Sequence, residues 1–178
     1  MRKTDLQPEQ ILIPGEYELG NESILKIYFR IFGKGHGKDL PPVIVARNDI
    51  TGRSLKDKYE SVVQHLSKRG YMGEMNINAP YNLGRARETY ARFNELIAKA
   101  PFYLFDGNHR TTAATLTHRS IHALELQSDE DIAEARRMIE RGQLFDFKRP
   151  ETSLRELVTA FEEYIIGNDR FEGLRKPY

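Results

Sequence analysis

Residues 102–114 read Phe-Tyr-Leu-Phe-Asp-Gly-Asn-His-Arg-Thr-Thr-Ala-Ala, and this stretch decides the fold. Its first four residues are aromatic or apolar and favour a strand over 102–105. An Asp-Gly pair follows, which is typical of a turn. We then expect a helix that Asn108 caps and that ends near His118. The stretch therefore predicts a strand, a turn and a helix in direct succession.

The predicted turn has the features of an anion-binding loop. Glycine permits a tight turn and a close approach to the backbone, and the first N–H groups of a helix have no partner within it. His109 and Arg110 fall in the first helical turn, where positive charge opposes the helix dipole. A bound polyphosphate would offset this cost, with the Arg110 fork and the Thr111 hydroxyl as donors. The alternative is an ordinary helix start with solvated basic side chains, in which Asp106 braces the turn rather than binding a metal.

Short apolar strands and amphipathic helices alternate on both sides of this unit, and this alternation predicts an α/β fold. The helices are expected to begin at capping residues, because Ser54, Ser128 and Ser153 each precede an acidic residue by three positions. The further predicted strands are 11–13, 43–46 and 123–126, and the further predicted helices are 21–33, 54–69, 85–99, and those after Ser128 and Ser153.

Length and composition limit the classes of protein. The chain has 178 residues, which we expect to form one domain over 1–178. It contains no cysteine, so disulfides, thiolate catalysis and cysteine zinc sites are excluded. No apolar run approaches the ~18 residues of a membrane span, and no apolar signal-peptide core follows the first residues. We therefore expect a cytoplasmic protein without membrane contact.

Positive charge is concentrated in one part of the chain. The net charge is +1, but residues 51–100 carry nine Lys or Arg against five acidic residues. A solvated helical face is one interpretation of this bias. The other is contact with DNA phosphates through Arg85, Arg87 and Arg92.

Residues 102–114 resemble a motif of the ParB/sulfiredoxin superfamily. The sulfiredoxin pattern has an aromatic strand, Gly-Cys-His-Arg, an alanine one turn later, an isoleucine strand and then Gln-Ser. The strand Pro41-Pro-Val-Ile-Val45 also resembles the Pro-Pro strand that precedes this motif, so the likeness covers about residues 10–46 and 101–140. The later residues that match the pattern are Arg119, Ile121, Ala123, Gln127 and Ser128.

This resemblance implies a fold and a ligand. The fold would be a small mixed sheet with flanking helices, a two-helix insertion over 47–100, and a final helix and tail over 151–178. The ligand would be ATP or another NTP with Mg²⁺ on its phosphates. Lys26 is the nearest equivalent of a lysine that serves ATP in sulfiredoxins. The nucleotide-binding residues implied are Gly107, Asn108, His109, Arg110, Thr111 and Lys26.

The same resemblance leaves three functional classes open. Asn108 stands where sulfiredoxins have their catalytic cysteine, so sulfinic acid reduction is excluded. The first class is an NTP-hydrolysing enzyme, which in some stand-alone members also cleaves DNA. The second is a small-molecule kinase of the free-serine-kinase type, with Glu16 or Glu18 as base. The third is a non-catalytic, nucleotide-dependent DNA-binding switch of the ParB type.

We expect the first class, an NTPase. No cluster of carboxylates indicates a protein-bound metal, which argues against a two-metal nuclease. The sequence leaves the identity of the nucleotide and the oligomeric state open. The candidate catalytic residues are His109, Arg110, Asp106 and Glu18.

Overall fold

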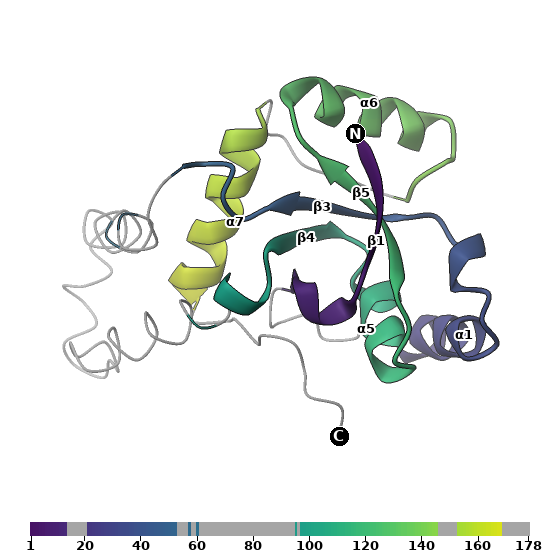
Figure 1. Ribbon diagram of the computed structural model, residues 1–178. Helices are drawn as coiled ribbons and strands as arrows, with labels where there is room; N and C mark the ends of the chain where they lie inside the picture. The colour runs from purple at the N-terminus through teal and green to yellow at the C-terminus, as the bar shows by residue number, and fades with distance from the viewer. Residues whose placement is uncertain are drawn as a thin grey trace.

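A five-stranded mixed sheet forms the centre of the computed structural model, which describes residues 1–13, 21–52, 57, 60, 95, 97–145 and 153–168 (Figure 1). The strand order is β1-β5-β3-β4-β2. β1 is antiparallel to β5 and β4 is antiparallel to β3, whereas β5 and β3, and β2 and β4, are parallel. The mixed α/β architecture is thus confirmed. The strands are β1 (Arg2–Leu6), β2 (Ile11–Leu12), β3 (Val43–Arg47), β4 (Phe102–Asp106) and β5 (Ile121–Leu126).

Helices cover both faces of the sheet. Val43 and Val45 of β3 belong to an apolar cluster with residues of α1 and α5, whereas Ile44 and Ala46 belong to a cluster with residues of α6 and α7. All four side chains are fully buried, as expected of a central strand that is covered on both faces. In Figure 1, α1 and α5 lie together on one side of the sheet. The helices are α1 (Glu22–Gly33), α5 (Asn108–Leu116), α6 (Asp129–Glu140) and α7 (Leu154–Asn168).

The predicted helix starts at Asn21, Ser128 and Ser153 are confirmed. The Asn21 side chain accepts a hydrogen bond from the backbone N–H of Ile24, and Ser128 forms a capping box with Asp131. Ser153 forms the corresponding reciprocal pair with Glu156 at 3.2 Å in both directions. The expected capping box at Ser54 lies outside the described residues.

Strand β1 has no counterpart in the sequence prediction. Its residues Arg-Lys-Thr-Asp-Leu lack the apolar alternation of a half-buried strand, and only Leu6 at its end is buried. The strand lies at the edge of the sheet, where it is held by backbone pairing from Arg2 opposite Glu125 to Leu6 opposite Ile121. Backbone hydrogen bonds do not depend on side-chain type, so the sequence of this strand has no apolar pattern from which it could be predicted.

The Met1 ammonium group pairs with the carboxylate of Asp131 in the first turn of α6. Burial acts to raise the pKa of Asp131. The hydrogen bonds from the ammonium group and from the backbone N–H groups of Gln127 and Ser128 outweigh it and hold that pKa below its ordinary value. One carboxylate therefore both caps α6 and holds the start of β1.

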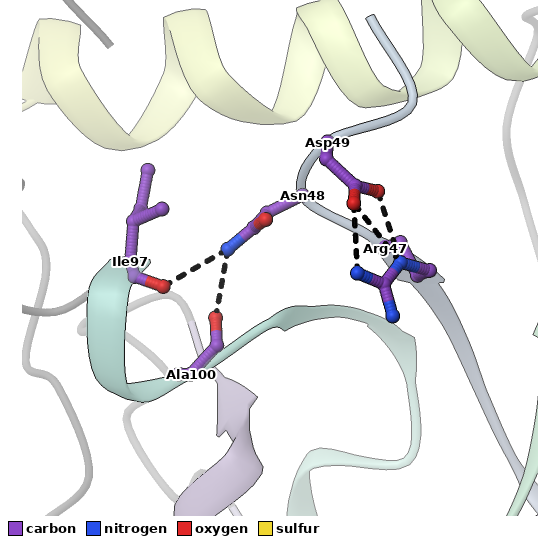
Figure 2. A network of polar contacts seen from close by, with 5 residues as sticks. All are labelled: Arg47, Asn48, Asp49, Ile97 and Ala100. Carbon is purple, nitrogen blue, oxygen red and sulfur yellow. Dashed lines mark hydrogen bonds and ion pairs between the residues drawn. The ribbon is translucent and has the colours of Figure 1, made fainter. Parts of the chain in front are cut away.

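The long connection between β3 and β4 leaves and rejoins the sheet at neighbouring points. Arg47 at the end of β3 lies opposite Phe102 at the start of β4. Figure 2 shows the Asn48 side-chain amide donating to the carbonyl oxygens of Ile97, at 3.0 Å, and Ala100, at 3.1 Å. Residues 97–99 are helical, so Asn48 satisfies carbonyl groups at the end of a helix. The two ends of the connection are thereby joined by one side chain.

Within this connection, the structure describes 57, 60, 95 and 97–99 as helical. The rest of the two expected helices lies outside the described residues, so the two-helix insertion stays a prediction. Arg85, Arg87 and Arg92, the expected DNA contacts, lie outside the described residues.

Replacement of Asn48 by alanine tests this joint. The variant loses both side-chain hydrogen bonds to the helix end, each contributing about 0.5–1.5 kcal/mol, so we expect the free energy of unfolding to fall by about 1–3 kcal/mol. Asp49→Ala is the matched control, because its exposed ion pair with Arg47 should contribute about 1 kcal/mol or less. Urea denaturation followed by circular dichroism measures both values. Equal losses in the two variants would contradict a joining role for Asn48.

Candidate functional site

The turn between β4 and α5 forms as the sequence predicts, but its capping residue differs. Gly107, which has no side chain to cap the helix, occupies the N-cap position of α5 with φ +107° and ψ 28°. Asn108 is the first helical residue, so the prediction that it caps the helix was wrong. The chain needs a left-handed residue to turn from the strand into the helix, and glycine adopts that conformation without strain from a Cβ atom.

Gly107 is also required by the packing of the turn. A Cβ atom at this position would lie 2.9 Å from Cβ of Val43 on β3, closer still to Cγ1 of Val43, and 3.1 Å from Nη2 of Arg110. Val43 therefore fills the space that the missing side chain leaves. The sequence predicts that the missing side chain of Gly107 leaves room for an anion. In the structure, the Val43 side chain of β3 lies against Gly107 on the side where a Cβ atom would be.

The Arg110 side chain is buried and donates hydrogen bonds to other parts of the protein. It is 3% exposed. Nη1 donates to the carbonyl oxygens of Pro41 and Pro42, at 2.9 Å for Pro42, and Nη2 donates to Oδ2 of Asp106 at 2.6 Å. The guanidinium group thus joins the start of α5 to the Pro-Pro segment before β3. In place of the expected grip on phosphate, this geometry gives Arg110 and Asp106 the role of bracing the turn.

Thr111 also serves the turn. Its side chain is fully buried, and its hydroxyl group donates to the carbonyl oxygen of Gly107 at 3.1 Å, the same oxygen that accepts the Thr111 backbone N–H at 2.9 Å. The contact of this hydroxyl group with a phosphate stays a prediction. A buried hydroxyl group satisfies its hydrogen bond within the helix when it points away from solvent.

Asn108 and His109 differ from these braced residues. Both side chains are half-buried, and Oδ1 of Asn108 and Nε2 of His109 are buried atoms without a hydrogen-bond partner in the structure. They lie in the first turn of α5, beside backbone N–H groups that have no acceptor within the helix. A buried polar atom without a partner costs about 1–3 kcal/mol. Two such atoms at one helix start therefore make this turn the candidate functional site.

The other predicted site residues are not brought to this turn by any contact that the described residues show. Lys26 lies on the exposed side of α1 and pairs with Glu22 at 3.0 Å. Glu16 and Glu18 lie outside the described residues. Within the described part of the chain, no three His, Asp or Glu residues gather as a metal site, and no helix is long and apolar enough to cross a membrane.

Phe145 is a neighbour of the site that the sequence analysis missed. Its ring centroid lies 5.0 Å from Cζ of Arg110, and its side chain is 47% exposed. It follows α6 in the sequence Gln143-Leu144-Phe145-Asp146-Phe147, which lies outside the predicted helices and strands, so no periodic pattern marks it.

Replacement of Gly107 by alanine tests the close packing of the turn. Left-handed strain and overpacking each cost about 1–3 kcal/mol, so we expect a loss of roughly 2 kcal/mol or more in the free energy of unfolding. Gly142→Ala is the matched control, because Gly142 has φ +70° but nothing within 4 Å of the added atom.

A double-mutant cycle with Val43→Ala isolates the steric part. The cost of Gly107→Ala should be smaller in the Val43→Ala background, because the opposing methyl groups are gone. Denaturant unfolding gives all four free energies. Strict additivity, together with equal losses at Gly107 and Gly142, would contradict the packing that we describe.

Comparison of the chain with protein-family models, with curated proteins and with solved structures finds no match. The likeness to the ParB/sulfiredoxin superfamily accordingly rests on the motif residues themselves. The unpartnered polar atoms at the start of α5 are the structural feature that bears on function.

Proposed function

We propose that this chain binds a nucleoside triphosphate, with Mg²⁺ on the phosphates, at the turn between β4 and α5, and that it hydrolyses this nucleotide. The observation that carries the proposal is the pair of buried, unpartnered polar atoms of Asn108 and His109 at the start of α5. Phosphate oxygens would accept hydrogen bonds from Nε2–H of His109, from the Asn108 amide once its NH₂ group takes the place of Oδ1, and from the backbone N–H groups beside them. The motif resemblance implies the same ligand at the same residues.

The electrostatics of the turn favour an anion. The start of a helix carries the equivalent of about half a positive charge, and the first turn of α5 contains no acidic residue. Asp106 lies just before it, but its carboxylate is paired with Arg110. A phosphate group that approached Asn108 would thus meet the helix dipole without an opposing uncompensated carboxylate in the turn.

Asn108 and His109 have the chemistry to contact phosphate. Rotation of the Asn108 amide exchanges its oxygen for the NH₂ group, which donates. His109 donates through Nε2 in one neutral tautomer and in the charged form, and its neutral form can accept a proton from an attacking water near neutral pH. We therefore assign Asn108 to binding and His109 to binding and proton transfer.

Arg110 and the metal ion take supporting roles in this proposal. Because the Arg110 guanidinium group is engaged with Pro41, Pro42 and Asp106, it positions the turn rather than the phosphates. Mg²⁺ would be held largely by phosphate oxygens and water, as it often is when a protein supplies few ligands. Mg²⁺ would neutralise charge on the phosphates during hydrolysis.

The test combines calorimetry with phosphate release. Wild-type protein should bind at least one of Mg·ATP, Mg·CTP, Mg·GTP and Mg·UTP and release inorganic phosphate from it. His109→Ala should lower kcat by on the order of tenfold or more and weaken binding less, because proton transfer contributes mainly in the transition state. His118→Ala is the control, since His118 is exposed just past the opposite end of α5 and should leave both values unchanged.

Three results would count against this function. If none of the four nucleotides binds, the proposed nucleotide site is contradicted. Unchanged affinity and turnover in a folded His109→Ala protein would also contradict it. Tight binding without phosphate release, with or without DNA, would retain the nucleotide site but replace the enzyme by a switch.

A further inference from the structure

Phe145 is an exposed aromatic side chain that stands against the candidate nucleotide site. Its ring lies 5.0 Å from the centre of the Arg110 guanidinium group, and Nη2 of that group lies 3.1 Å from the Cβ position of Gly107. The ring is therefore a near neighbour of the turn that α5 follows. The other large apolar side chains that the structure describes as exposed lie on α1, at Ile24, Ile27 and Phe29, or on α5, at Leu116.

Among the described residues, the apolar clusters do not account for the position of Phe145. The side chain belongs to neither of the two apolar clusters of buried residues, and nearly half of its surface faces solvent. Its recorded ring contact is with a guanidinium group, which attracts the face of an aromatic ring. Arg110 is itself held by three hydrogen bonds, so this contact fixes the ring on a rigid support.

We infer that Phe145 stacks on the base of the nucleotide, an inference that rests on the proposed function of the same site. A nucleoside triphosphate is longer than the first turn of α5, so its base must extend past the N–H groups that hold the phosphates. An aromatic ring that lies against a cation and is nearly half exposed offers the apolar surface that a base requires. Such stacking tolerates every base, because each base has a π face.

In this role, Phe145 determines the preference for ligands that carry a nucleoside. Phosphate groups would contact the start of α5, and the ring would distinguish a nucleotide from an inorganic polyphosphate. A ring that only shielded Arg110 from water would instead affect both classes of ligand alike, through the position of the turn. The two roles differ in which ligand responds to loss of the ring.

The experiment compares two ligands on three variants by calorimetry at saturating Mg²⁺. The ligands are the NTP that wild-type protein binds most tightly among ATP, CTP, GTP and UTP, and inorganic tripolyphosphate. Phe145→Ala should weaken NTP binding by about tenfold to a hundredfold and change tripolyphosphate binding by less than about twofold. Phe29→Ala is the matched control, because Phe29 is 45% exposed on α1, and it should change neither affinity.

Phe145→Trp supplies a second, independent readout. The chain contains no tryptophan, so this variant has a single indole fluorophore at the site. It should retain NTP affinity within about threefold, because indole also stacks on bases, and its emission should be quenched by the NTP but not by tripolyphosphate.

The outcomes separate this inference from the proposed function. If wild-type protein binds neither ligand, both fail. If it binds the NTP and folded Phe145→Ala binds it equally well, the stacking role alone is overturned. Equal weakening of NTP and tripolyphosphate would also overturn it and reduce Phe145 to a cover for Arg110.

Discussion

The turn between β4 and α5 depends on the hydrogen bonds that the buried Arg110 guanidinium group donates. This group donates to the carbonyl oxygens of Pro41 and Pro42 and to the carboxylate of Asp106, so one side chain ties together the residues before β3, the end of β4 and the start of α5. A charge that is 3% exposed is tolerated only when it is paired and hydrogen-bonded. Gly107 permits this arrangement, because it lets the turn lie directly against Val43.

This bracing changes how the Asp-Gly-Asn-His-Arg-Thr motif is interpreted. Taken as a sequence, its polar residues all look available to a phosphate. In the structure, Asp106, Arg110 and Thr111 bond to the protein, and Gly107 packs on a strand. The side chains of Asn108 and His109 are the ones left with unpartnered atoms, in the first turn of α5. The motif thus divides into residues that build the turn and residues that we propose face a ligand.

Several elements could be predicted because their signals are local. The apolar run of β3, the aromatic run of β4 and the capping residues Asn21, Ser128 and Ser153 depend on short stretches of chain, and the structure places them as expected. β1 could not be found, because an edge strand held by its backbone needs no apolar alternation. The direction of the Arg110 side chain and the approach of Phe145 are tertiary facts. They depend on residues about 70 and 35 positions away, which no local pattern connects.

The central claim is that a nucleotide occupies the start of α5, and backbone amide NMR tests it most directly. On titration with a Mg·NTP, the account predicts that the largest shifts occur at the N–H groups of 108–110 and at the His109 ring, with smaller changes at the far end of α5 near His118. Saturable shifts confined to other parts of the chain, with 108–110 unmoved, would contradict it.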